Sequence, residues 1–202
     1  MNTSSIYVFA LIGLMFLIAP KQWWPGFYNP TFFGVTSLLS SVLIILPKLI
    51  FRAKEICDRE AVTLLRTTIL IALLLNGMGE LYLYQLYKYG FPYDKILHFI
   101  VPFLFVIVLT SFAEVRFGAG FKYSLIIAAF FVTIGSVAWE FFEYLSDLLF
   151  KTTEFGIYGQ YKFIDTSFDI IFDILGIFTS IISLNQKEFY AKVVSGYCQG
   201  KQ

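Results

Sequence analysis

The chain has 202 residues and a formal net charge of +1; 58% of its residues are hydrophobic, 20% aromatic and only 14% charged. A soluble domain usually carries about 25% charged residues, so this composition excludes an ordinary water-soluble fold and indicates a polytopic membrane protein. The small net charge gives no basic surface for nucleic acid, and the two cysteines supply neither a disulfide framework nor a CxxC metal motif.

Six apolar stretches predict membrane-spanning helices, because a bilayer core about 30 Å thick needs roughly 20 apolar residues per helix. The first, residues 6–19, is short and ends before Pro20; its start lacks the positive charge of a signal peptide, so we expect a retained helix. The other stretches are, in chain order, residues 31–51, 61–87, 95–113, 123–150 and 165–184. The prediction is an all-α bundle of about six transmembrane helices that forms a single domain over residues 1–202.

The basic residues of the connecting segments predict the orientation of the bundle. An even number of spans places both termini on one side, which carries nine Lys and Arg residues against five on the other. The first group is Lys48, Arg52, Lys54, Arg59, Arg116, Lys122, Lys187, Lys192 and Lys201, and the second is Lys21, Lys88, Lys95, Lys151 and Lys162. Because cytoplasmic loops are enriched in Lys and Arg, we expect both termini to be cytoplasmic.

Ionisable residues inside the expected spans cost about 2.5–3.5 kcal/mol each near a helix centre and therefore mark functional or tightly paired positions. In this chain they lie late in the third and fifth spans and early in the fourth and sixth. They are Glu80; then Asp94, Lys95 and His98; then Glu140 and Glu143; and finally Asp165, Asp169 and Asp173. With the orientation above, all of these positions fall in the outer half of the membrane.

The spacing of these residues places them on single helix faces, since residues three or four apart are neighbours on a helix. Asp94 and His98 are four apart, Glu140 and Glu143 are three apart, and the aspartates of the sixth span follow one another at intervals of four. Such polar stripes are too costly to face lipid. We therefore expect them to face one another and to form one polar pocket that opens to the outside.

Several of these residues also have a structural interpretation. Asp94 and Asp165 are of a type favoured at helix N-caps, Lys95 could extend to the membrane interface, and the buried acids could form a hydrogen-bonded network. The outer half, however, has too few cations to balance its acids, so either several carboxylates carry protons or a cation binds. Carboxylates with one imidazole suit Mg²⁺, Mn²⁺, Fe²⁺ or Zn²⁺.

These patterns predict a site with catalytic groups, metal ligands and supporting residues. The catalytic candidates are His98, Asp94, Glu140, Glu143 and Asp169. The candidate ligands of a divalent metal ion are His98, Glu140, Glu143, Asp169 and Asp173, and the pocket is completed by Glu80, Asp165 and Lys95. Asp173 is the deepest acid, roughly 13 Å inside the sixth helix, so its charge must be met by His98, a bound cation or its own proton.

Three short motifs follow one another between about residues 93 and 178, together with a glycine. They are Tyr93-Asp94-Lys95-x-x-His98-Phe99, Glu140-x-x-Glu143 and Asp165-Thr166-x-x-Asp169, and the glycine is Gly176. This ordered set resembles the YjdF family of bacterial inner-membrane proteins and, more distantly, the VanZ-like superfamily. The resemblance implies a multi-pass protein of a bacterial-type cytoplasmic (inner) membrane. The association of VanZ-like proteins with glycopeptide-antibiotic resistance implies a link to envelope chemistry.

Three functions are compatible with such a pocket. The first is a metal-dependent enzyme that acts on a lipid or lipid-linked envelope substrate at the outer leaflet. The second is a non-catalytic envelope or antibiotic-resistance factor whose polar cluster is structural. The third is a cation- or proton-coupled transporter, although the nearly acid-free inner half offers no complete pathway. Membrane lipids are expected partners in each case, and nucleic acid in none.

Reporter fusions test the predicted orientation. Fusions after Lys88 and after Lys151 are both expected to report the outer side, because each of these residues follows a span that runs outward. Two cytoplasmic signals would invert the assignment of the pocket to the outer half. Two different signals would show that the number of spans is wrong.

Overall fold

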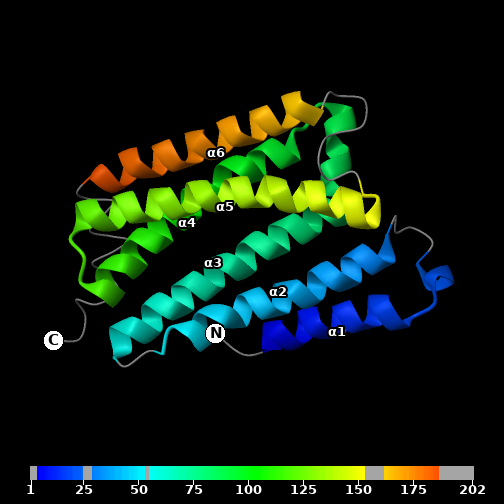
Figure 1. Cartoon of the computed structure of the whole chain (residues 1–202), viewed down its shortest axis with the longest axis horizontal. Helices are drawn as coiled ribbons and strands as arrows, with labels where there is room; N and C mark the ends of the chain where they lie inside the picture. Colours follow the sequence, from blue (N-terminus) through cyan, green and yellow to red (C-terminus); the bar gives the residue numbers. More distant parts are fainter. Residues whose placement is uncertain (1–3, 25–28, 53–54, 153–161, 187–202) are drawn as a thin grey trace.

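The computed structural model describes residues 4–24, 29–52, 55–152 and 162–186, and the regular elements within these residues are all helices. In chain order, with η for a 3-10 helix, they are α1 (Ser4–Ile18), η1 (Lys21–Trp23), α2 (Pro30–Ile50), α3 (Ile56–Leu81), η2 (Leu83–Tyr89), α4 (Tyr93–Phe117), α5 (Phe121–Phe150) and α6 (Lys162–Asn185). Figure 1 shows an elongated bundle in which the long helices run alternately toward its two ends. The predicted all-α membrane bundle is confirmed.

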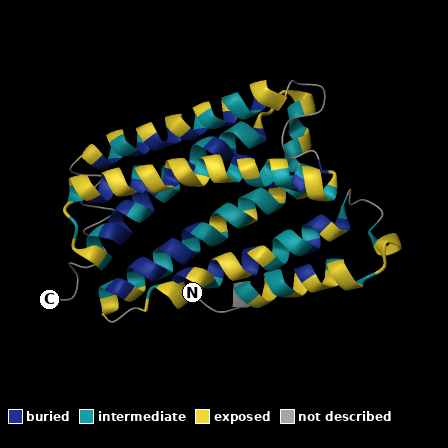
Figure 2. Ribbon diagram, in the orientation of Figure 1, coloured by how far each residue is buried: buried dark blue, intermediate teal, exposed yellow. Residues whose placement is uncertain are grey.

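Five helices, α2 to α6, are long and apolar enough to cross a membrane, whereas the apolar part of α1, Ile6–Ile18, is shorter. α1 lies along α2 at one side of the bundle (Figure 1). Exposed residues lie along all the long helices (Figure 2). Many of these exposed residues are large and apolar, as expected for surfaces that contact lipid. Some basic residues used for the orientation lie outside the described part of the chain, namely Lys54, Lys187, Lys192 and Lys201.

The third predicted span is wrong at its end. Instead of one helix over residues 61–87, α3 ends at Leu81 and the separate 3-10 helix η2 follows. The ring of Tyr84 lies against Gly79, and its hydroxyl donates a 2.6 Å hydrogen bond to Oδ1 of Asn76 in α3. The aromatic run therefore folds back onto α3, a turn that an apolar sequence pattern does not distinguish from a continuing helix.

The central helix is α4, which packs against α3, α5 and α6. Its C-terminal half carries the apolar core: Val106 packs with residues of α5 and α6, and Phe112 packs with residues of α3. At this end Nη1 of Arg116 donates to Oδ2 of Asp58 in α3 at 2.8 Å, which forms an ion pair between the two helices. The N-terminal half of α4 is polar by contrast and carries the ionisable residues described below.

The backbones of α4 and α6 approach each other closely at Gly176. A Cβ atom at this position would collide with the backbone carbonyl oxygen of Phe99 in α4, so only glycine fits without a shift. Gly176 lies three residues after Asp173, and Phe99 follows His98 directly. The close approach therefore holds the acidic face of α6 against the turn of α4 that carries His98.

Replacing Gly176 by alanine is expected to lower stability, although alanine is the better helix former. The new Cβ would meet a backbone oxygen that cannot rotate away, so we expect a loss of about 1–3 kcal/mol. The measurement is the thermal unfolding midpoint of the purified protein in detergent. Gly135→Ala is the control, because nothing lies within 4 Å of a Cβ at that position. Equal midpoints for the two variants would contradict the close approach.

Candidate functional site

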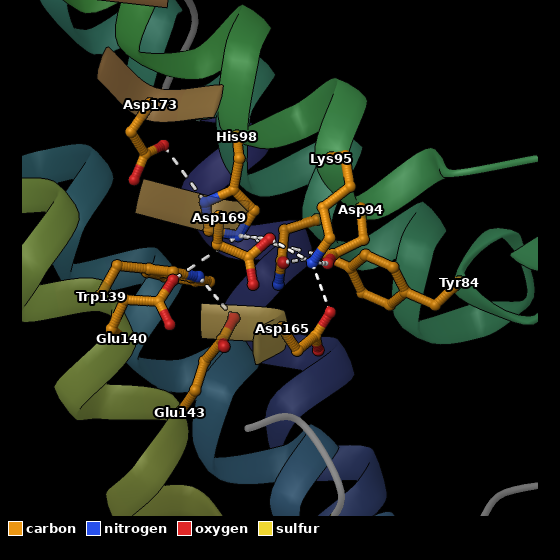
Figure 3. Close-up of polar contacts among 11 residues, drawn as sticks. Tyr84, Asp94, Lys95, His98, Trp139, Glu140, Glu143, Asp165, Asp169 and Asp173 are labelled. Carbon is orange, nitrogen blue, oxygen red and sulfur yellow. Dashed lines mark hydrogen bonds and ion pairs between the residues drawn. The ribbon is translucent and has the colours of Figure 1, made fainter. Parts of the chain in front are cut away.

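Ionisable side chains from three helices meet at the end of the bundle where α4 and α6 begin (Figures 1 and 3). They are Asp94, Lys95 and His98 of α4, Glu140 of α5, and Asp165, Asp169 and Asp173 of α6. The α6 aspartates are each only 3% exposed, which follows from their spacing of four residues along the face that α6 turns toward α4. The structure thus brings one polar face of each helix together.

Lys95 is the centre of an ion-pair network. Its Nζ lies 3.0 Å from Oδ2 of Asp94, 2.6 Å from Oδ1 of Asp165 and 2.5 Å from Oδ1 of Asp169. The Lys95 side chain is only 13% exposed, so the interpretation that it extends to the membrane interface is wrong. It turns inward because three carboxylates, two of them on α6, offer its charge a better environment than lipid does.

His98 is the centre of a second network that shares members with the first (Figure 3). Its Nδ1 lies 3.1 Å from Oδ1 of Asp173, a hydrogen-bond distance. Its Nε2 faces three carboxylate oxygens at longer range: Asp94 at 3.7 Å, Glu140 at 3.8 Å and Asp169 at 3.6 Å. These distances exceed those of ordinary hydrogen bonds.

Glu140 is buried at 5% exposure, and neither of its carboxylate oxygens has a hydrogen-bond partner among the described residues. The same holds for Oδ2 of Asp173. Buried polar atoms are nearly always satisfied in proteins, and a carboxylate without a partner in an apolar environment is costly. The unsatisfied oxygens therefore call for a cation or proton at the position that Glu140 and His98 face together.

The charges of the cluster do not balance. Five carboxylates, those of Asp94, Glu140, Asp165, Asp169 and Asp173, surround one ammonium and one imidazole. The acids remain in excess even if the imidazole is charged. The predicted shortage of cations is thus a property of the assembled cluster.

Two groups of three residues in the described part of the chain could hold a metal ion. They are Asp94, His98 and Asp169, and His98, Glu140 and Asp173, with the potential ligand atoms of each group within 4.8 Å of one another. Ligand atoms at about 2.0–2.2 Å from a shared ion lie roughly 3–3.6 Å apart. The separations of 3.6–3.8 Å from Nε2 of His98 to Asp94, Asp169 and Glu140 are slightly longer than this range. Within a group, a small adjustment of side chains would let the ligand atoms share one ion.

Four predicted site residues lie outside both groups. Lys95 and Asp165 belong to the ion-pair network described above, and the other two are Glu143 and Glu80. Oε1 of Glu143, which was predicted as a ligand and catalytic group, accepts a 2.7 Å hydrogen bond from Nε1 of Trp139 one turn earlier on α5. Glu80 is half-buried near the end of α3, and neither group contains it. The roles assigned to both residues remain predictions.

The N-cap interpretation of Asp94 and Asp165 is wrong. Pro92 is the N-cap residue of α4, and α6 already begins at Lys162, so both aspartates lie within the first turn of their helices. Acidic residues in a first turn interact favourably with the helix dipole. Here their carboxylates also bind Lys95, which gives them a place in the cluster rather than a role in helix initiation.

The sequence predicted Lys95 as a pocket residue but not its position between three carboxylates, and it missed the contribution of Trp139. Lys95 follows Asp94 and precedes His98 by three residues, so its place on the polar turn of α4 was a usable signal. Trp139 adjoins Glu140 in the sequence, but only the structure shows that its indole binds Glu143. A tryptophan near a membrane interface does not by itself indicate such a bond.

A family model described as a predicted membrane protein (DUF2238) matches residues 4–187, nearly the whole chain. No significant match was found among curated proteins or solved structures.

Proposed function

This chain belongs to the DUF2238 family of predicted membrane proteins, and we propose that it binds a divalent metal ion at Nε2 of His98. The remaining ligands in this proposal are carboxylate oxygens of Asp94, Glu140 and Asp169. The YjdF resemblance of residues 93–178 agrees with the family assignment, whereas the likeness to VanZ-like proteins stays a prediction. The location in a bacterial inner membrane with cytoplasmic termini is part of the proposal.

The observation that carries the proposal is the buried carboxylate of Glu140. Both of its oxygens lack hydrogen-bond partners among the described residues, and Oε1 lies 3.8 Å from Nε2 of His98. A metal ion between them would satisfy a carboxylate that is otherwise costly to bury. It would also reduce the excess of acids in the cluster, which a purely structural network leaves unexplained.

The bond between His98 and Asp173 supports the same assignment. Histidines that bind a metal through one nitrogen usually donate the N–H of the other nitrogen to a carboxylate or carbonyl, which fixes the ring. Asp173 lies 3.1 Å from Nδ1, so a proton on that nitrogen leaves the lone pair of Nε2 directed toward the three carboxylates. In this arrangement Asp173 orients His98 and does not itself coordinate the ion.

The donor set of one imidazole nitrogen and several carboxylate oxygens fits Mn²⁺, Fe²⁺ and Zn²⁺, and Mg²⁺ through the carboxylates. A bound ion of this kind supplies Lewis-acid polarisation or activates water for hydrolysis. The side chain of Asp94 is 24% exposed, whereas those of Glu140 and Asp169 are only 7% and 5% exposed. The cluster is therefore most accessible at Asp94, near the helix ends where lipid headgroups lie in a bilayer.

This placement supports an enzyme that acts on a lipid or lipid-linked envelope substrate at the outer leaflet. A substrate headgroup would enter at Asp94, and the protein would provide orientation and exclude water around the buried ligands. The opposite half of α4 is packed with apolar side chains such as Val106 and Phe112, which argues against a transporter with a continuous polar pathway. A non-catalytic envelope factor remains the outcome if no metal binds.

Metal analysis of the purified protein tests the proposal. We expect about one divalent ion per chain, and His98→Ala and Glu140→Gln should each weaken binding by more than about 100-fold, beyond the loss typical of outer-shell changes. Glu143→Gln is the matched control, because it makes the same change on the same helix at a carboxylate held by Trp139. A protein without metal, or equal effects at Glu140 and Glu143, would contradict the assignment.

The orienting role of Asp173 gives a separate prediction. Asp173→Asn should still fold but should bind the metal about 10–100-fold more weakly, the range found when the partner of a metal-binding histidine is changed. Titration with Mn²⁺ or Zn²⁺ measures the change. Asp147→Asn serves as control, since Asp147 binds Lys162 and Thr152 at the end of α5. An unchanged affinity in Asp173→Asn would remove Asp173 from the site.

A further inference from the structure

We infer that Lys95 is an internal counter-ion that competes with the metal ion for the carboxylates of Asp94 and Asp169. When the ion binds, the ammonium group leaves these two carboxylates and remains bound to Asp165. The inference rests on the proposed metal site and concerns its regulation and selectivity. It assigns a role to a lysine that is not itself a ligand, and it explains why an acidic metal site contains a buried cation.

The first line of support is that the two networks share carboxylates. Oδ1 of Asp169 lies 2.5 Å from Nζ of Lys95 and 3.6 Å from Nε2 of His98. Asp94 is divided in the same way, with Oδ2 at 3.0 Å from Lys95 and Oδ1 at 3.7 Å from His98. Two of the proposed ligands are therefore already paired with Lys95 when the ion arrives.

The second line of support is electrostatic. An ion about 2.1 Å from Oδ1 of Asp169 would lie at most about 4.6 Å from an ammonium bound to the same oxygen. A doubly charged ion and an ammonium group at this distance repel strongly in a poorly screened site. Both cations cannot keep Asp169 without a large loss of affinity.

The third line of support is that Lys95 has another acceptor. Oδ1 of Asp165 lies 2.6 Å from Nζ of Lys95, and Asp165 belongs to neither group of potential metal ligands. Asp165 begins the acidic stripe of α6 one turn before Asp169, so a small rotation of the lysine side chain keeps this bond while releasing Asp169. The ammonium therefore stays paired throughout the exchange.

Selectivity for divalent ions follows from such an exchange. A monovalent ion brings no more charge to Asp94 and Asp169 than the ammonium that it would displace. A divalent ion brings twice that charge and also gains Glu140 and His98 as ligands. Lys95 thus reduces the repulsion between the acids in the metal-free protein and raises the charge that an incoming cation must carry.

Titration of the purified full-length protein with Mn²⁺, Zn²⁺ and Na⁺ tests the inference. Lys95→Met should bind Mn²⁺ or Zn²⁺ at least about fivefold more tightly than the parent, within the range of ordinary coupling between sites, and should discriminate less against Na⁺. Lys95→Arg keeps the charge and should not bind more tightly. Lys162→Met is the control, because Lys162 pairs with Asp147 and its side chain is 61% exposed.

A double-mutant cycle separates exchange from a general effect of charge. Asp165→Asn should weaken metal binding in the parent, because Lys95 then has no carboxylate to bind after it leaves Asp94 and Asp169. In the Lys95→Met background the same substitution should have little effect. If Asp165→Asn weakens binding equally in both backgrounds, there is no exchange. This cycle uses Lys95→Gln if the methionine variant does not fold.

The outcomes distinguish the inference from the proposed function. Binding of metal by the parent with no gain in Lys95→Met overturns the inference and leaves the metal site standing. Weaker binding in Lys95→Met also overturns it, because Lys95 would then support the ion. If neither the parent nor Lys95→Met binds any of the tested metals, the proposed function itself fails.

Discussion

The buried ammonium of Lys95 is the contact on which the arrangement of α4 and α6 depends. It joins α4 to two aspartates of α6, at 2.6 Å and 2.5 Å. One turn deeper His98 meets Asp173, and one position further Phe99 meets Gly176 backbone to backbone. The contact between α4 and α6 therefore consists of an ion pair, a hydrogen bond and a close backbone approach, which follow one another along α6 at Asp169, Asp173 and Gly176. Because the aspartates of α6 recur at intervals of one turn, a shift of α6 by one turn would still place acids beside Lys95 and His98. The contact at Gly176, where a side chain would collide with the carbonyl oxygen of Phe99, therefore fixes the register of the two helices.

The two ends of α4 differ in how their buried charges are compensated. At the C-terminal end Arg116 forms an ion pair with Asp58 beside an apolar cluster that includes Phe112. At the N-terminal end one lysine faces several acids, and Glu140 has no hydrogen-bond partner among the described residues. A buried pair of opposite charges needs no additional ion, whereas an excess of buried carboxylates destabilises the fold. Such intramembrane charges are retained mainly where function requires them. This contrast within one helix is the reason to place the function at the N-terminal end.

The sequence predicted the helices and the acidic face of α6 well, because burial of Asp165, Asp169 and Asp173 follows directly from their spacing. It predicted Lys95 as a pocket residue but could not predict that the ammonium lies between three carboxylates, since a lysine near a helix end can equally well extend to the interface. It also could not predict which nitrogen of His98 meets Asp173, because spacing fixes a helix face but not a ring orientation. The end of α3 was missed for a similar reason: the contact of Tyr84 with Asn76 is tertiary and leaves no trace in hydropathy.

The same carboxylates stabilise the fold and form the proposed ligands, which links the two properties. Asp169 is both the acceptor of a short bond from Lys95 and a neighbour of Nε2 of His98. An ion that takes this oxygen removes one tie between α4 and α6 and replaces it with a bond that reaches α5 through Glu140. In the proposed metal-bound state, the site would thus exchange a two-helix contact for a three-helix contact. Because α5 packs against α4 through a separate apolar core, the bundle has the support to survive that exchange, and the polar end can adjust while the apolar end stays fixed.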